Sequence, residues 1–322
     1  MPYWEIVTRS FAIAWRRKYL WLLALFSGEG GGTSFNYSQS SPSNGGTGNL
    51  PDFGSVPRQV GDWLNQNLGL VLVIAVVAVL VWIALFVLAA VCEGAVVRAS
   101  AEHDAERPFG LGLAWQCGVA TMGAMVRFRL LLIALGLPAF IVVAALVAGL
   151  VLAILGHNTG VAVTLGVLAV LIFLGAFVYV IYLSFLDRLG TRAIVLELLG
   201  ARAALVRGHR LLAKRLGRVL LVWLLSIATS IVVGIGSAIV LAILILPAVF
   251  IGIAVYSGGS PLFWLLIVVG LLILVPLVLL LAGFLAAQSS TYWTLAFRRM
   301  EIDRAPNYGY QQPQAPSPGP AV

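Results

Sequence analysis

Charged side chains are scarce in this sequence: Asp, Glu, Lys and Arg make up only 10% of its 322 residues, against about 25% in an average soluble protein. Apolar residues make up 61%, and the mean hydropathy is +1.02. A soluble domain or a disordered chain with this much apolar surface would aggregate, so both classes are excluded. The composition predicts an all-α, polytopic transmembrane helix bundle.

Residues that build common catalytic and metal sites are also few. Two cysteines, Cys92 and Cys117, provide no disulfide framework. The three histidines lie in separate segments, far from the spacing of metal ligands. The sequence has no G-x-S-x-G elbow, no phosphate-binding P-loop and no H-E-x-x-H motif. We therefore expect a protein that is not an enzyme and that holds no metal or cofactor.

Long charge-free runs define the candidate membrane spans, because a helix needs about 20 apolar residues to cross a bilayer. Polar turns near residues 156–160 and 256–261 divide the two longest runs. We expect one membrane domain over residues 1–304, with six spans arranged as three hairpins. The expected spans are 8–27, 68–92, 130–155, 161–186, 219–252 and 262–288.

Two of these spans leave alternatives open. After the basic residues 16–18, only residues 19–26 are apolar. A span over 8–27 therefore requires the basic side chains to reach toward the head groups. Otherwise this segment is a surface helix and five spans remain. Residues 219–256 could instead form two short spans that turn at residues 234–237. A cleaved signal peptide is disfavoured because no A-x-A-like site follows the first apolar run.

Basic residues are distributed asymmetrically around the expected spans. Nineteen of the twenty precede the apolar part of span one, follow span six or lie in the two long even-to-odd connections, and only Arg58 lies in the opposite set of loops. The positive-inside rule then places both termini in the cytoplasm. Arginine in place of lysine, with much Ala, Val and Leu, indicates a high-GC bacterial genome. We therefore expect a multi-pass protein of the bacterial inner membrane.

Two segments are predicted to lie outside the bilayer. Residues 27–67 are rich in Gly, Ser and Asn, which is typical of a flexible external loop. Residues 305–322 contain several prolines and are predicted to form a disordered cytoplasmic tail.

A basic amphipathic stretch leads into each odd-numbered span, at residues 11–25, 114–135 and 203–225. In the third stretch, one helix face carries basic side chains while leucines lie on another. This pattern predicts an interfacial helix that contacts anionic lipid head groups, at about 1 kcal/mol for each basic residue near the surface. Nucleic-acid binding is disfavoured because no aromatic residues interleave with the cations. The candidate lipid-contacting residues are Arg207, Arg210, Lys214 and Arg218.

Acidic residues at the ends of helices are candidates for a gate or a ligand anchor. The simpler interpretation is an ion pair with a nearby arginine, and we prefer it for each of them. These residues are Glu93, Asp187 and Glu197. Spans two to six contain no charged side chain at all, which counts against a proton-coupled pump because proton relays need such groups.

Three prolines are expected to interrupt spans three, five and six. Proline removes a backbone hydrogen bond, and broken helices line the binding sites of many transporters. These residues are Pro138, Pro247 and Pro276.

Short motifs resemble a broad group of uncharacterised bacterial multi-span membrane proteins. They are Tyr-Trp-Glu-Ile at 3–6, Ala-Trp-Arg-Arg-Lys-Tyr-Leu-Trp-Leu-Leu at 14–23, Ala-Ile-Val-Leu-Glu at 193–197 and Ala-Leu-Val-Arg-Gly at 204–208. That group includes the membrane domain that accompanies some glycerophosphodiester phosphodiesterases. The resemblance implies a membrane domain without that activity, because the catalytic domain is absent.

These observations favour a non-enzymatic integral membrane protein that organises lipid or a partner protein at the inner face of the membrane. The alternative is a transporter or lipid-translocation protein that uses the proline-broken spans. A scaffold should be packed throughout, whereas a transporter needs a cleft near the midplane. The expected partners are the lipid bilayer, anionic head groups and a membrane protein, and the sequence does not indicate an oligomeric state.

Overall fold

The structure is a computed structural model that describes residues 3–28, 67–156, 159–257 and 262–302. Every regular element within these residues is an α-helix, which confirms the predicted fold class. The expected external loop and the proline-rich tail lie outside the described residues, except for positions 27, 28 and 67 of the loop. The helices are α1 (Tyr3–Arg16), α2 (Tyr19–Ser27), α4 (Leu68–Asp104), α5 (Leu111–Leu155), α6 (Thr159–Glu197), α7 (Ala201–Lys214), α8 (Leu216–Ser257) and α9 (Leu262–Ile302).

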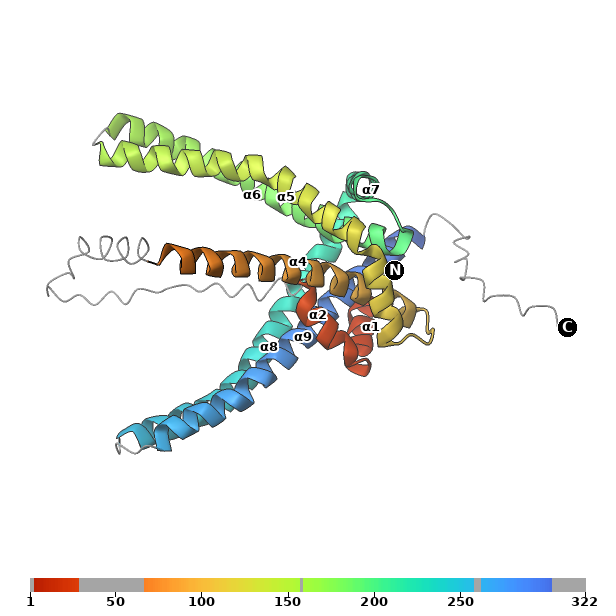
Figure 1. Ribbon diagram of the computed structural model, residues 1–322. Coiled ribbons are helices and arrows are strands. Elements are labelled where there is room, and N and C mark those ends of the chain that lie inside the picture. Colours follow the sequence, from red (N-terminus) through yellow and green to blue (C-terminus); the bar gives the residue numbers. More distant parts are fainter. Residues whose placement is uncertain (1–2, 29–66, 157–158, 258–261, 303–322) are drawn as a thin grey trace.

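Five helices are long and apolar enough to cross a membrane: α4, α5, α6, α8 and α9. They form three arms that diverge from a common end, namely the α5–α6 pair, α4 alone and the α8–α9 pair (Figure 1). The short helices α1, α2 and α7 lie at this common end. We call it the junction, and it comprises these three helices with residues 90–107, 114–129, 185–197, 215–222 and 283–302.

The arms and the junction differ sharply in burial. In the most apolar 18-residue stretch of α4, α5 and α6 no residue is buried by other parts of the chain, and in α8 and α9 only 11% and 6% are. Arms of this kind would aggregate in water, but lipid chains cover them in a bilayer. The five helices of the arms therefore indicate an integral membrane protein with several membrane crossings.

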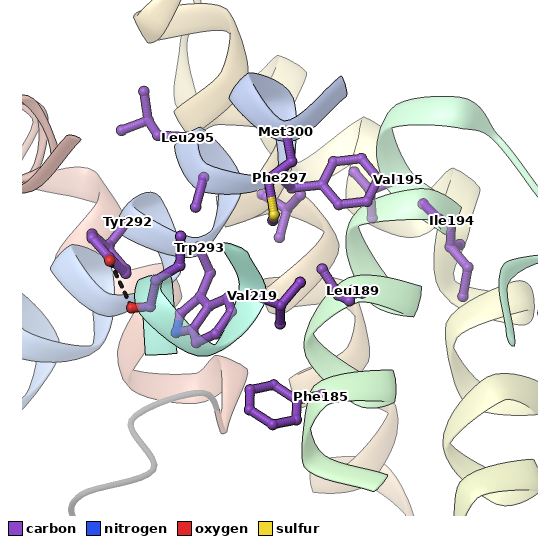
Figure 2. Close-up of a cluster of buried hydrophobic side chains, with 14 of the residues drawn as sticks. Phe185, Leu189, Ile194, Val195, Val219, Tyr292, Trp293, Leu295, Phe297 and Met300 are labelled. Carbon is purple, nitrogen blue, oxygen red and sulfur yellow. Dashed lines mark hydrogen bonds between the residues drawn. The ribbon is translucent and has the colours of Figure 1, made fainter. Parts of the chain in front are cut away.

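Side chains from several helices build the core of the junction. Phe185 and Leu189 of α6 face Val219 of α8 and Trp293 of α9 (Figure 2). The neighbouring hydroxyl of Tyr292 donates a hydrogen bond of 2.8 Å to the carbonyl of Val222, shown as a dashed line in Figure 2. Burial of each large apolar side chain stabilises the fold by about 1.5–3 kcal/mol. The arms are thus attached to one another at this end.

Glycine permits the closest helix contacts in the junction. A Cβ atom on Gly118 of α5 would lie 2.3 Å from the carbonyl oxygen of Val91 in α4. A Cβ atom on Gly283 of α9 would lie 2.6 Å from the carbonyl oxygen of Trp21 in α2. Backbones approach this closely only where one helix has no side chain. These two residues therefore allow α5 to pack on α4 and α9 to pack on α2.

The first segment of the chain corrects one prediction. Residues 8–27 do not form one spanning helix, because α1 ends at Arg16 and α2 begins at Tyr19. The indole nitrogen of Trp21 donates a hydrogen bond of 2.7 Å to the carbonyl of Ala14, which holds α2 against α1. With nine residues, α2 is about 14 Å long and too short to cross a bilayer. The break keeps the basic residues 16–18 exposed rather than carrying them into lipid.

The last residue of α2 lies beyond the middle of α4, far from the residue at which α4 begins. The carbonyl of Ser27 accepts a hydrogen bond of 3.1 Å from Arg129, which also pairs with Glu93 of α4. Since α4 begins 25 residues before Glu93, its apolar part extends about 38 Å from that point. The last residue of α2 and the first residue of α4 therefore lie at opposite ends of the apolar part of α4.

The expected repeat of basic helices appears twice. Both α1 and α7 have 14 residues, and each ends at a break that contains basic residues, at 17–18 and at 215. By contrast, α5 is continuous from Leu111 to Leu155 and contains the whole of the stretch 114–135. The first and third stretches therefore share a helix–break–helix arrangement that the second lacks.

The prolines do not interrupt the helices, which corrects a second prediction. Pro138 and Pro276 lie within continuous α5 and α9, and Pro247 lies within continuous α8. In α5, the hydroxyl of Tyr179 donates a hydrogen bond of 3.0 Å to the carbonyl of Leu135, one turn before Pro138. A neighbouring helix can thus supply donors where proline weakens the backbone ladder. Because α8 is also helical through residues 234–237, the alternative of two short spans there is wrong.

Candidate functional site

Charged residues are confined to one end of the described molecule. Residues 68–92, 130–186 and 219–297 contain no charged side chain, and these ranges include the exposed parts of all three arms. The charged residues that the structure describes belong to the junction and its breaks. We therefore treat the charged groups of the junction as the candidate site.

Asp104, at the end of α4, connects three helices. Its carboxylate pairs with Arg9 of α1 at 2.8 Å and with Arg298 of α9 at 2.7 Å. Arg298 also donates to the carbonyl of Ala101, and Arg9 donates to the backbone carbonyl of Asp104. Neighbouring pairs join Glu102 to Arg98 and Arg107. These contacts hold α1 and α9 against the end of α4, which is a structural role.

Glu93 is buried at the base of the arms, with a side chain that is 2% exposed. It pairs with Arg129 of α5, whose guanidinium also lies 5.9 Å from the ring centroid of Phe86. Through the carbonyl of Ser27, this arginine also contacts α2. Glu93 thus belongs to an ion pair that joins α2, α4 and α5.

The other two predicted acids lie at the end of α6. Glu197 pairs with Arg207 of α7 through both carboxylate oxygens, at 3.2–3.3 Å from the arginine Nε. Asp187 is half-buried, and its backbone carbonyl accepts a hydrogen bond of 2.8 Å from Thr191. Glu197 therefore holds α7 to α6, and the structure does not bring the three predicted acids together.

The predicted basic face divides into groups with different surroundings. Arg207 is engaged by Glu197, whereas Arg210 and Lys214 are exposed and form no ion pair with another described residue. Arg218 is also exposed but lies beyond the break, in the first turn of α8. Arg210 and Lys214 are therefore the members of the predicted face that are available to an external anion.

The orientation of α7 places these cations near the base of an arm. His209, next to Arg210, shares a hydrogen bond of 2.8 Å with the hydroxyl of Tyr182 in α6. Tyr182 stacks on Tyr179 with ring centroids 6.3 Å apart. Both tyrosines precede the first charged residue after the α6 arm, where an aromatic belt is expected. The exposed side of α7 thus adjoins the membrane boundary.

A half-buried pair between α2 and α4 was not anticipated from the sequence. The hydroxyl of Tyr19 shares a hydrogen bond of 2.6 Å with Nε2 of His103. Burial raises the pKa of Tyr19 to about 12, although the nearby Arg17 opposes this effect. Because the two residues are 84 positions apart, hydropathy gives no indication that they meet.

An apolar cavity of about 280 Å³ lies between α5 and α6. It is lined by Val143, Leu146, Val147, Ala169, Val170, Ile172 and Phe173. These side chains offer no polar group that could orient a substrate, and acyl chains of the surrounding bilayer fit such a surface. Within the described residues, no three His, Cys, Asp or Glu side chains are grouped so that they could hold a metal ion.

Comparisons with known proteins place the chain in a family without assigning a function. No curated protein and no solved structure matches it. The expected resemblance to the phosphodiesterase-associated membrane domain is not supported by these comparisons and stays a prediction. Residues 7–295, which include all three arms and most of the junction, match a family of unknown function, DUF7544. The chain belongs to this family.

Proposed function

We propose that this protein is a non-enzymatic membrane scaffold that organises anionic lipid, or a partner protein, at the membrane face where its arms converge. This face corresponds to the cytoplasmic side of a bacterial inner membrane, because the junction holds nearly all the basic residues. The observation that supports the proposal most strongly is the pair of exposed cations on α7, Arg210 and Lys214, beside the base of the α5–α6 arm.

The separation of the arms favours a scaffold over a single-chain channel. No residue in the most apolar stretches of α4, α5 and α6 is buried, so lipid or helices of other proteins occupy their outer sides. A transporter would need these arms to enclose a path with groups that recognise a solute. The apolar cavity between α5 and α6 offers no such groups.

The two cations on α7 set the expected strength of the lipid contact. Each basic side chain near an anionic surface contributes about 1 kcal/mol. Two of them therefore favour anionic over zwitterionic lipid by roughly thirty-fold, since every 1.4 kcal/mol is a factor of ten. The paired residue Arg207 should contribute less, because Glu197 already neutralises its charge.

The test compares two variants with the same loss of charge. The R210Q/K214Q variant removes exposed cations, and the R107Q/R207Q variant removes two cations that are paired with Glu102 and Glu197. Each protein is extracted in a mild detergent, and its bound lipids are identified by native mass spectrometry. We expect R210Q/K214Q alone to lose retained phosphatidylglycerol.

Equal retention in both variants would overturn the assignment to α7. A uniform small molecule that binds stoichiometrically to the wild-type protein would favour the transporter instead. Mixed annular lipid together with a co-purifying membrane protein would favour the partner-protein form of the proposal.

A further inference from the structure

The break between α1 and α2 presents three consecutive cations. Arg16, Arg17 and Lys18 are all exposed, and none forms an ion pair with another residue that the structure describes. Several arginines elsewhere in the junction are engaged by acids, as Arg9 and Arg298 are by Asp104. A cluster of exposed cations without acidic neighbours is a surface that attracts anions.

Aromatic residues lie directly beside these cations. Trp15 is 66% exposed, yet its ring contacts Phe284 of α9 edge-on at 5.7 Å and Trp21 of α2 at 6.0 Å between centroids. Trp21 and Phe284 are themselves 5.3 Å apart. The hydrogen bond from Trp21 to Ala14 fixes this cluster across the break.

The position of Phe284 along α9 gives the depth of the aromatic cluster. Phe284 follows the first residue of α9, Leu262, by 22 positions. At 1.5 Å per residue this is about 33 Å, close to the thickness of a hydrocarbon core. The cluster therefore lies where the α9 arm leaves the bilayer. Tryptophan is enriched at this depth because its ring is both apolar and able to donate a hydrogen bond.

The course of α1 separates two equally exposed tryptophans. Along α9, Phe11 contacts Phe284, Ser10 contacts Gln288 and Glu5 pairs with Arg299. Thus α1 runs antiparallel to α9, and its first turn lies away from the membrane. Trp4, which is 68% exposed, precedes Trp15 by 11 residues and so lies on the same helix face. The two indoles share exposure and face but differ in depth.

We propose that the α1–α2 break is a binding site for anionic phospholipid in the leaflet at the junction. Trp15 enters the boundary between head groups and acyl chains beside Trp21 and Phe284, while Arg16, Arg17 and Lys18 bind the lipid phosphates. This inference deepens the proposed function, because it names the lipid class and adds a contact that is separate from α7. The bilayer around the α9 arm supplies the ligand, since the cluster continues the exposed apolar surface of that arm.

The first experiment measures the depth of individual tryptophans. The full chain is reconstituted into vesicles of phosphatidylglycerol and phosphatidylcholine, with and without bromine on the acyl chains, because brominated chains quench only the indoles that touch them. The emission of one tryptophan is the difference between the wild-type protein and a W15F, W4F, W82F or W293F variant. Trp82 on the exposed α4 arm and Trp293 in the junction core provide the quenched and unquenched references.

We expect the emission of Trp15 to be quenched as strongly as that of Trp82, and the emission of Trp4 to be spared as that of Trp293 is. Trp15 emission that survives bromination would overturn the proposal. Equal quenching of Trp4 and Trp15 would also overturn it, because the whole helix would then lie in the interface.

The second experiment tests the cations. In native mass spectrometry, the R16Q/R17Q/K18Q variant should lose phosphatidylglycerol retention by at least about tenfold, given the attraction of each basic residue for anionic lipid. The same measurement on R210Q/K214Q separates the site at the break from the contact at α7, and this variant is the control. If only that control loses lipid, the contact at α7 stands and the site at the break is wrong. If only R16Q/R17Q/K18Q loses lipid, the site at the break stands and the contact at α7 is wrong.

Discussion

The arms and the junction of this protein are stabilised by different surroundings. The arms are almost entirely apolar, and the most hydrophobic stretches of α4, α5 and α6 contain no buried residue. The junction buries polar and charged groups such as Glu93, Ser100 and Arg192 together with its apolar core. A helix in lipid satisfies its own backbone hydrogen bonds and needs no neighbour, whereas helices outside lipid must cover each other. The difference indicates that the fold is specified at the junction, while the bilayer supports the arms.

The largest effect expected from this comparison is a difference between the two sides of the membrane. A reporter fused after Arg304, next to the end of α9, should behave as cytoplasmic, and a reporter inserted at Gly45 should behave as external. The reason is that five apolar helices, α4, α5, α6, α8 and α9, lie between the start of α4 and the end of α9, and an odd number of crossings places these two points on opposite sides. Paired alkaline phosphatase and green fluorescent protein fusions measure this directly. Signals from the same side at both positions would show an even number of crossings between them and would contradict five spanning helices.

Much of the division into arms and junction could be predicted from the sequence, because it follows from where charged residues occur along the chain. The charge-free runs located the arms from residues 68, 130, 161, 219 and 262 onward. The continuation of α4 beyond residue 92 was expected, but its end at Asp104 was not, because the buried end of α4 carries the polar residues that a hydropathy pattern excludes from a span. The break after Arg16 was missed for a related reason. Three basic residues beside an apolar run are compatible with two structures. One is a spanning helix whose basic side chains reach toward the head groups, and the other is a helix that ends at the basic residues.

The candidate site was less predictable, because its contacts join distant parts of the chain. Arg9 and Asp104 are 95 positions apart, and Arg298 is a further 194 positions from Asp104. The sequence predicted that Arg207 would face lipid with Arg210, yet Glu197 engages it. Helical periodicity identifies which residues share a face but not which carboxylate of another helix meets them. The divergence of the arms likewise has no sequence signal, since apolar helices look alike whether lipid or protein covers them.

The next largest effect is expected at the buried ion pair of the junction. In the E93A variant, Arg129 loses its buried partner, and removal of one member of such a pair destabilises a fold by about 3–5 kcal/mol. Thermal unfolding in detergent, followed by circular dichroism, measures the loss. The E93A/R129A double variant should be more stable than E93A alone, because no uncompensated charge remains. A double variant that is less stable than E93A would contradict this account.

A smaller effect should separate a junction glycine from an arm glycine. The G118A variant places a methyl group 2.3 Å from the carbonyl of Val91, so α4 and α5 must move apart. Overpacking of this kind costs about 1–3 kcal/mol. The matched control is G166A on the α6 arm, where a Cβ atom meets nothing within 4 Å. We expect a lower unfolding temperature for G118A only. A comparable loss in G166A would show that the arms depend on protein packing after all.

The smallest effect concerns the phenol of Tyr19, which lies in the junction outside the spans. Burial raises its pKa to about 12 from an ordinary value of 10. The folded state therefore holds the phenolic proton more tightly than the unfolded state does. The stability from this group is complete below pH 10 and is lost as the pH rises through 12. Two pKa units correspond to about 3 kcal/mol, and hydration of the half-buried phenol reduces this to about 1–2 kcal/mol.

A comparison of the wild-type protein with Y19F between pH 9 and 12 isolates this contribution, since the other tyrosines titrate in both proteins. The wild-type protein should lose stability more steeply than Y19F over this range, and the two slopes should agree below pH 9. If stability fell with pH at the same slope in both proteins over the whole range, the phenol of Tyr19 would be as hydrated as an exposed tyrosine. The junction would then be less tightly closed at the α1–α2 break than its hydrogen bond to His103 implies.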